Sequence, residues 1–419
     1  MPSNQNSQDR SLMKALSFDF KLARFIYSKI FGMLSPGAYF GRFSALRYSD
    51  HIEPELPGDD WVKIRTAYCG ICASDLHAIF LNGSMDSPTI PFISFPMVLG
   101  HEIVGTIVET GNEVRELHKG ERVVLVTLLS CVTRGIDPPC PACQEGNPGI
   151  CRNFAEGNLP PGIMIGSNKK INGGFAPYVV SHYQQCTKIP NEVSLEEAVL
   201  ADPFGVALHG ILQNPPRSGD KVLVYGCGVL GLCAIISLRT LYPECHIIAL
   251  GKYAFQRDLA AHYGAHIVVE PGADLFQIVA GITKGKLYKV RRGKPILMGG
   301  VHVIYDCVGS ADTIETALRL TKERGKVILI GADVPKRFEW SPLWFREITI
   351  TGSMAIGMEN YQGERKHTFE IFLELLKDKR IDVKPLVTHR FKLAQYKDAF
   401  RTCIDKQSNE SVKVVFDFT

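Results

Sequence analysis

The sequence lacks a strong excess of charge of either sign. Its 419 residues carry a formal net charge of +4, with 47 Lys and Arg against 43 Asp and Glu. Domains whose main partner is nucleic acid usually have a far more basic face. The composition therefore argues against nucleic acid as the main partner. With 45% apolar residues, the chain is long enough for two domains with their own cores.

The chain also shows no secretory signal and no clear membrane span. Residues 1–12, MPSNQNSQDRSL, are polar and lack the apolar region of a signal peptide. The longest apolar run, 222–238, contains three glycines and begins like a strand, which favours a strand, turn and helix over a span. We therefore predict a cytoplasmic protein with a disordered extension at 1–12 and without stable membrane insertion.

A disulfide framework is not indicated either. The twelve cysteines are spread over the whole chain, and three of them cluster at 140–151. This distribution is more typical of metal binding in a reducing compartment than of a secreted, cross-linked domain.

Polar side chains that suit a metal ion gather where predicted strands end. The segment 69–77, CGICASDLH, follows an alternating run at 61–67 that predicts a strand. His101 and Glu102 follow another apolar run, and Asp202 lies between two apolar segments. One thiolate, one imidazole and one carboxylate would leave the fourth position of a tetrahedral zinc open, as in a catalytic site.

A dinucleotide-binding unit is predicted further along. A short apolar strand at 221–225 leads into glycine-rich residues, an apolar helix ending near 241 and a second strand at 246–250. Such glycines permit a tight turn and let a pyrophosphate approach a helix N-terminus. The candidate residues at this turn are Gly226, Gly228, Val229, Leu230 and Gly231.

The end of the second strand bears on cofactor choice. Units that prefer NAD carry an acidic residue about twenty positions after the third glycine. Here that count reaches Gly251, followed by Lys252 and, further on, Arg257. A glycine and cations suit a 2′-phosphate, so NADP(H) is favoured slightly over NAD(H). The alternative is that Gly251 only closes a turn and Lys252 points to water.

These motifs together resemble the zinc-dependent medium-chain alcohol and polyol dehydrogenases. The resemblance rests on CGICASDLH, GHEIVGTIVETGNEV, CPACQEGNPGIC and YGCGVLG in that order, and it extends from about Met13 to the end of the sequence. It implies an α/β protein with a β-rich catalytic domain, a chaperonin-cofactor-like barrel, plus a doubly wound parallel-sheet Rossmann domain. The implied bounds are 13–202 and 354–419 for the zinc-binding catalytic domain and 203–353 for the dinucleotide-binding domain.

The resemblance implies Cys72, His101 and Asp202 as ligands of a catalytic zinc. Cys69 is the rival to Cys72, which is preferred because it directly precedes the sequence Ala-Ser-Asp. Glu102 is the alternative carboxylate and could exchange with water on the metal. Asp75 would accept a hydrogen bond from His101 and fix its tautomer.

The resemblance also implies a proton path. Ser74 would take the proton of the substrate hydroxyl and pass it through the cofactor ribose towards His77, while hydride moves to the nicotinamide. The alternatives are a turn hydroxyl for Ser74 and an ordinary surface histidine for His77. His209, in an apolar helical pattern, is interpreted as a packed core residue.

A second, structural zinc is expected in the long loop 130–172. Cys140, Cys143 and Cys151 are three of its ligands by resemblance, and Asp137 stands where the family has a fourth cysteine. Cys131 is the competing fourth ligand. The other possibility is a degenerate lobe whose cysteines are only buried thiols.

Two segments fall outside the motifs. Apolar residues in 18–34 follow a helical stripe between basic residues, so this segment could lie on a membrane surface. The favoured interpretation is a helix or long loop that packs on its own domain or on a second subunit. The basic stretch 284–294 is interpreted as a solvated surface insertion.

The sequence thus predicts a zinc-dependent oxidoreductase that transfers hydride between an alcohol or polyol and NAD(P). The expected partner is a small alcohol or carbonyl substrate, and a homodimer or homotetramer is expected. One alternative is a zinc-free reductase of enones or quinones, and another is a non-catalytic binding protein that keeps the fold. The retained metal ligands argue against both.

Overall fold

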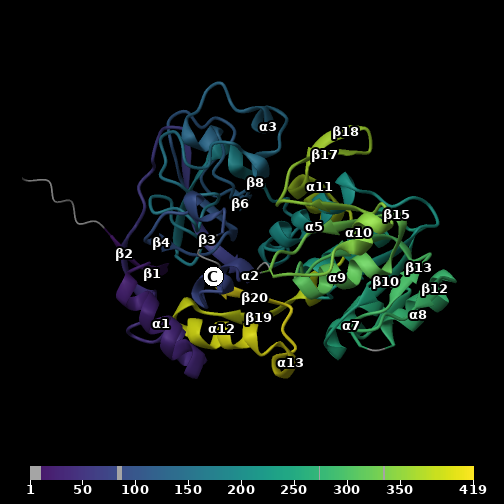
Figure 1. Ribbon diagram of the computed structural model, residues 1–419. Helices are drawn as coiled ribbons and strands as arrows, with labels where there is room; N and C mark the ends of the chain where they lie inside the picture. Colours follow the sequence, from purple (N-terminus) through teal and green to yellow (C-terminus); the bar gives the residue numbers. More distant parts are fainter. Residues whose placement is uncertain (1–10, 83–86, 273, 334–335) are drawn as a thin grey trace, which may run out of the picture. The chain divides into compact units, whose positions relative to one another are not determined.

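The computed structural model describes residues 11–419 except 83–86, 273 and 334–335 (Figure 1). Contacts divide the chain into two compact units. The first comprises 1–200, 387–405 and 413–419, and the second comprises 201–386 and 406–412. Of the extension expected at 1–12, residues 1–10 lie outside the described part, and Leu12 already begins a strand.

The first unit is built on a seven-stranded, mostly antiparallel sheet. Its strands follow the order β19-β20-β3-β5-β6-β8, and β7 also pairs with β3. Buried Val62 and Ile64 alternate with partly exposed Lys63 and exposed Arg65 along β3, as the sequence predicts. The strands are β3 (Trp61–Gly70), β5 (Glu102–Thr110), β6 (Arg122–Leu125), β7 (Tyr178–His182), β8 (Cys186–Lys188), β19 (Val387–Phe391) and β20 (Lys413–Asp417).

A smaller sheet and short helices complete this unit. The sheet has the order β2-β1-β4. Its strands are β1 (Leu12–Phe18), β2 (Leu46–Ile52) and β4 (Met97–Val98). The helices are α1 (Leu22–Leu34), α2 (Ala73–Ile79), α3 (Pro141–Gln144), α4 (Leu195–Ala198) and α12 (Tyr396–Ile404).

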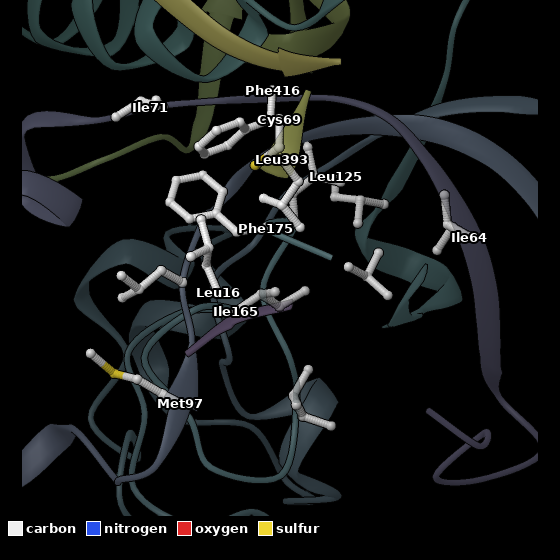
Figure 2. Close-up of a cluster of buried hydrophobic side chains, with 14 of the residues drawn as sticks. Leu16, Ile64, Cys69, Ile71, Met97, Leu125, Ile165, Phe175, Leu393 and Phe416 are labelled. Carbon is white, nitrogen blue, oxygen red and sulfur yellow. The ribbon is translucent and has the colours of Figure 1, made fainter. Parts of the chain in front are cut away.

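One core joins distant parts of the chain within the first unit. Figure 2 shows Phe175 and Phe416 close together, and their ring centroids lie 4.8 Å apart. Cys69 lies beside them, together with Leu16 from β1. Burying aromatic and aliphatic side chains from four segments explains why the last strand, β20, belongs to a unit that begins with β1.

The second unit is a doubly wound α/β domain. Its parallel sheet has the order β11-β10-β9-β14-β15-β16, which is the 3-2-1-4-5-6 order of dinucleotide-binding folds. The strands are β9 (Lys221–Tyr225), β10 (His246–Leu250), β11 (Ile267–Val269), β14 (Val301–Asp306), β15 (Thr321–Leu329) and β16 (Thr349–Gly352). The helices are α5 (Ala201–Gln213), α6 (Val229–Leu241), α7 (Ala254–His262), α8 (Leu275–Thr283), α9 (Ala311–Leu320), α10 (Ser341–Phe345), α11 (Thr368–Lys377) and α13 (Lys406–Asn409).

Two hairpins occur in addition to the parallel sheet. The basic stretch 284–294 is largely exposed, in agreement with a solvated insertion, and it forms part of a hairpin in which β12 (Lys286–Tyr288) pairs with β13 (Ile296–Met298). A second hairpin, β17 (Met358–Tyr361) with β18 (Glu364–His367), leads into α11.

The segment 354–386 lies in the second unit, although the sequence assigned it to the catalytic domain. The physical reason is that α11 packs on α5, where the rings of Phe372 and Phe204 lie 4.6 Å apart. The apolar run 222–238 forms β9 and most of α6, as predicted. Among the described helices, none has both the length and the apolar character that crossing a membrane requires.

Candidate active site

Three possible metal ligands meet at the ends of two paired strands. The ligand atoms of Cys72, His101 and Glu102 all lie within 4.8 Å of one another. Gly70, at the end of β3, pairs with Glu102, at the start of β5. Cys72 follows the end of β3, and His101 precedes the start of β5, so these two residues are neighbours. A thiol, an imidazole and a carboxylate at this spacing form a donor set that fits zinc.

Cys69, the rival ligand, is a core residue. Its side chain lies in the apolar cluster near Phe175 and Phe416 (Figure 2). A Cβ on Gly100 would come within 2.9 Å of its sulfur, so the space around that sulfur is filled. Burial raises the pKa of the Cys69 thiol well above its ordinary value, which disfavours the thiolate that a metal needs.

Asp75 connects the two segments that carry Cys72 and His101. One carboxylate oxygen accepts a hydrogen bond from the Cys72 amide at 3.0 Å, and the other accepts one from the Gly100 amide at 3.2 Å. The His101 Nδ1 atom lies 3.8 Å from Asp75, which is an electrostatic contact and not the direct hydrogen bond that was expected. Burial raises the pKa of Asp75, while His101 opposes that shift.

Glu102 is held by a buried lysine. The Lys413 Nζ atom donates to both Glu102 carboxylate oxygens at 2.6 Å and also lies 3.3 Å from the Ile71 carbonyl oxygen. A Cβ on Gly70 would come within 1.8 Å of a Glu102 carboxylate oxygen, so only glycine leaves room for this carboxylate. The ion pair connects β5 with β20 and offsets the charge next to the metal ligands.

The remaining predicted residues lie on two different helices. Ser74 is exposed in the first turn of α2, and His77 lies further along that helix. The His77 Nδ1 atom is buried and has no hydrogen-bond partner among the residues that the structure describes. Asp202 is in the first turn of α5, in the second unit, and is not part of the group formed by Cys72, His101 and Glu102.

A second metal-type group consists of four cysteines. The sulfur atoms of Cys131, Cys140, Cys143 and Cys151 lie within 4.8 Å of one another. Cys131 therefore takes the position expected of Asp137, which is exposed and outside the group. All twelve cysteines are free thiols, and four sulfurs at this spacing fit a tetrahedral structural zinc.

Hydrogen bonds to sulfur surround this group. The Cys140 amide lies 3.3 Å from the Cys131 sulfur, and the Asn153 side-chain amide lies 3.2 Å from the same sulfur. Hydrogen bonds from the backbone contribute to lowering the pKa of Cys140 to about 6, against the opposing effect of its burial. These donors favour the Cys140 thiolate, whereas burial raises the pKa of Cys143 to about 11 and raises that of Cys151 further.

Arg134 stabilises the same loop and was missed at the sequence level. Its guanidinium is fully buried and donates to the carbonyl oxygens of Leu129, Glu156, Leu159, Pro160 and Gly162. Burial lowers the pKa of Arg134. An arginine in a loop normally indicates a surface residue, so the sequence contained no signal for this role.

The glycine-rich turn between β9 and α6 has the geometry that a dinucleotide needs. Gly226 has a φ of +92°, which only glycine adopts readily. A Cβ on Gly231 would lie 1.7 Å from the Gly226 carbonyl oxygen, so a side chain there would break the packing of helix on strand. A Cβ on Gly228, the N-cap of α6, would meet no described atom within 4 Å. Open space in front of this helix N-terminus fits a pyrophosphate.

The end of β10 holds the residues relevant to cofactor choice. Arg257 donates to the carbonyl oxygens of Gly251 and Lys252, each at 3.1 Å, and lies 3.4 Å from Glu270. The Lys252 ammonium lies 5.3 Å from the centre of the Tyr253 ring. Arg257 thus shapes this turn, and Lys252 supplies a cation beside it.

His209 is packed, as the sequence suggested, but it also has a polar partner. Its side chain is 13% exposed on α5, and its Nδ1 atom forms a short hydrogen bond with Glu359 of β17. Gln213, one turn further along α5, donates to the other Glu359 oxygen at 2.9 Å. These contacts attach the β17–β18 hairpin to α5.

Two family models match the chain. The alcohol dehydrogenase GroES-like domain covers residues 58–191, and the zinc-binding dehydrogenase domain covers residues 229–377. The first match contains both metal-type groups, and the second begins at Val229, the first residue of α6, directly after Gly228 of the glycine-rich turn.

Individual proteins agree with these models. The chain is 30% identical to L-idonate 5-dehydrogenase of Vitis vinifera over 94% of this chain and 97% of the relative. It is 29% identical to sorbitol dehydrogenase of Arabidopsis thaliana over 91% and 94% of the two chains. A crystal structure of a short chain alcohol dehydrogenase from E. coli CFT073 with NADH superposes with a TM-score of 0.73 at 22% identity. It covers 97% of this chain and 100% of that one.

Proposed function

This chain belongs to the family of zinc-dependent medium-chain alcohol and polyol dehydrogenases, and we propose that Cys72, His101 and Asp202 hold its catalytic zinc. The protein is an oxidoreductase that transfers hydride between a CH–OH group and a nicotinamide cofactor. The observation that carries the ligand proposal is the spacing of Cys72 and His101, whose ligand atoms lie within 4.8 Å of each other and of Glu102.

Asp202 is proposed as the third ligand because Glu102 is already engaged. Both Glu102 oxygens accept hydrogen bonds from Lys413. If Glu102 moved away from Lys413, two buried charges would lose their partners in an apolar environment. Glu102 is therefore the alternative carboxylate, which reaches the metal only when it leaves Lys413. When bound, zinc acts as a Lewis acid on the substrate hydroxyl oxygen.

The chain's own residues would hold and move the proton. Asp75 fixes the segments of Cys72 and His101 through its two backbone hydrogen bonds. Ser74 would accept the substrate proton, which its exposure in the first turn of α2 allows. The buried His77 Nδ1 atom, with no partner among the described residues, is available to continue the path to solvent.

A second zinc is proposed at Cys131, Cys140, Cys143 and Cys151. Four thiolates leave no open position, which is typical of a structural site. Its role would be to hold the loop that Arg134 also organises.

The cofactor is proposed to be NADP(H) in preference to NAD(H). The position where an acidic residue would repel a 2′-phosphate is Gly251, and the neighbouring Lys252 is a cation that can bind one. Arg257 supports the proposal less directly, because its guanidinium is engaged by two carbonyl oxygens.

We also propose a homodimer or homotetramer that associates through the second unit, in a reducing cytoplasm. Trp340, Trp344 and Phe345 are exposed beside β16, which lies at one edge of the parallel sheet. Exposed aromatic side chains next to an unpaired strand edge favour a protein interface. Twelve free cysteines suit a reducing compartment.

The test combines metal analysis with a substrate screen. Two zinc ions per chain are expected in the purified enzyme. Oxidation of alcohols, polyols and amino-sugar alcohols should be followed by nicotinamide absorbance with both cofactors. A zinc-free preparation with full activity on enones or quinones would support the zinc-free reductase instead. Two bound zincs without turnover of any alcohol would support the non-catalytic binding protein.

A further inference from the structure

Helix α1 carries an apolar stripe that faces away from the protein. We define the α1 stripe as five exposed side chains that fall on one face at about 100° per residue: Leu22, Ile26, Ile30, Met33 and Leu34. Their exposed fractions run from 46% at Ile26 to 83% at Met33. Soluble proteins rarely leave such a contiguous apolar face open unless it binds something.

The opposite face of α1 attaches the helix to the first unit. Ser28 and Gly32 are buried, and the Ser28 hydroxyl accepts a hydrogen bond from the Ala45 amide at 3.3 Å. A Cβ on Gly32 would lie within 2.2 Å of the Tyr39 ring, so the backbone packs directly on that ring. Phe25 packs against the core of the unit. The helix therefore cannot turn its stripe inward without losing these contacts.

The apolar patch continues beyond the helix. Phe31 and Phe43, both exposed, contact Tyr27 with ring centroids 4.9 Å and 5.8 Å away. Aromatic rings with a polar tip are typical of the boundary between water and the lipid headgroups.

In the sequence segment that forms this patch, cations outnumber acids. Between residues 18 and 47 the sequence has five cations, Lys21, Arg24, Lys29, Arg42 and Arg47, and a single acid, Asp19. On a helix of 3.6 residues per turn, Arg24 and Lys29 fall on the two sides of the α1 stripe. Arg42 is exposed, and Lys21 is exposed although its ammonium lies 3.3 Å from Asp19. The Lys29 ammonium donates to the Leu81 carbonyl oxygen at 2.6 Å, so Lys21 and Arg42 are the cations most accessible to a negative surface.

From this pattern we propose that α1 docks the enzyme on an anionic phospholipid surface. The helix has 13 residues and a length of about 20 Å, which is too short to span a bilayer but suits a helix lying in the headgroup region. Its apolar side chains would enter the acyl boundary while the flanking cations bind lipid phosphates.

Charge distinguishes this occupant from a second copy of the chain. In a two-fold symmetric contact the same surface meets itself, so the cationic rim would face another cationic rim. An anionic lipid surface complements the rim instead. Near the exposed aromatic residues at α10, the exposed cations Lys336 and Arg337 are accompanied by the exposed acids Asp333, Glu339 and Glu347. Charges of both signs can pair across a two-fold contact, so self-association is assigned to α10 and not to α1.

The experiment is vesicle flotation of the full-length chain. The protein should float with vesicles of phosphatidylcholine and phosphatidylglycerol but not with phosphatidylcholine alone. Binding should weaken as salt rises from about 0.1 M to about 1 M, because ions screen the cations. The double variant Ile30→Ser/Leu34→Ser should lower the partition coefficient at least about tenfold. Lys21→Gln/Arg42→Gln should lower it by about fivefold per charge.

The control is Ile278→Ser, which removes an exposed isoleucine from α8 in the second unit and should leave flotation unchanged. Each variant must keep the melting temperature and turnover of the wild type. If the double variant does not fold, Met33→Ser at the exposed helix end replaces it. Equal flotation on both vesicles, or equal flotation of wild type and stripe variants, would overturn the proposal. A change of oligomeric state without lipid in the stripe variants would assign the surface to a second copy.

Discussion

The ammonium of Lys413 and the carboxylate of Glu102 form a buried ion pair between positions 311 residues apart, with both oxygens 2.6 Å from the nitrogen. The two side chains are 2% and 1% exposed. Because Glu102 also lies within 4.8 Å of the ligand atoms of Cys72 and His101, this pair sets the charge next to the proposed catalytic zinc. Its effects on stability and on metal binding can be separated experimentally.

Lys413→Ala should strongly destabilise the protein. The change leaves the Glu102 carboxylate buried and unpaired, which costs about 3–5 kcal/mol for such pairs. The free energy of unfolding from urea titration is the measurement. As a control, Lys392→Ala removes an ion pair with Asp417 that is largely exposed on the lysine side and should cost less than about 1 kcal/mol. Similar losses in the two variants would contradict the argument.

Asp202→Asn should remove the catalytic zinc and abolish turnover. The matched comparison is Glu102→Gln/Lys413→Met, which removes both charges of the buried pair and so avoids leaving one unpaired. We expect this double variant to retain both zincs, as measured by metal analysis of the purified protein. If instead Asp202→Asn keeps two zincs and the double variant has only one, Glu102 is the third ligand.

Cys131→Ser should release one zinc per chain while Asp137→Ala retains both. The reason is that Cys131 lies in the four-cysteine group, whereas Asp137 is exposed outside it. The structural site should also hold its loop, so a chelator should lower the melting temperature of the wild type. The opposite result, with zinc lost from Asp137→Ala only, would indicate that Asp137 is the fourth ligand, as the sequence favoured.

Lys252→Ala should lower kcat/KM with NADP about tenfold and change it little with NAD. A single charge-assisted contact to a phosphate is worth about 1.5 kcal/mol or more, and only NADP carries the 2′-phosphate. Lys284→Ala, at the C-cap of α8 in the same unit, is the control. We prefer this test to Gly251→Asp, because a Cβ there would lie 2.9 Å from the Arg257 side chain. Equal losses with both cofactors would contradict a role in phosphate recognition.

Sequence patterns predicted the parallel sheet most closely. The strands at 221–225 and 246–250 have the predicted bounds, and the helix between them ends at Leu241 as predicted. These strands are continuous apolar runs because both faces of a parallel sheet are covered, and turn residues mark their ends. Local information therefore suffices for them.

Contacts between distant segments were not predictable in the same way. Lys413 pairs with Glu102 only because β20 lies against β3, and no local sequence pattern predicts that these two strands pair. The assignment of 354–386 failed for the same reason, since it depends on α11 packing against α5. For Cys131, spacing by resemblance favoured Asp137, but a turn in the chain brings the more distant thiol to the group.

The α1 segment gives an intermediate case. The apolar period predicted a helix within 18–34, and the helix is there. Periodicity does not say which face meets the protein, and the favoured packing on its own domain holds only for the face of Ser28 and Gly32. Small residues can bury a helix face as well as large ones, so the larger apolar face remains exposed.

Because β20 lies between β19 and β3, part of this sheet can form only after the end of the chain has been synthesised. Protein synthesis delivers the four cysteines and the loop around them early, within 21 consecutive positions of one another. The pocket of Cys72, His101 and Glu102 stays without its compensating cation until residues 413–417 have left the exit tunnel. On the proposed ligand set, the four cysteines would be able to hold zinc hundreds of residues before the ion pair that holds Glu102 can form, and a premature stop near residue 400 would leave the Glu102 carboxylate without its cation.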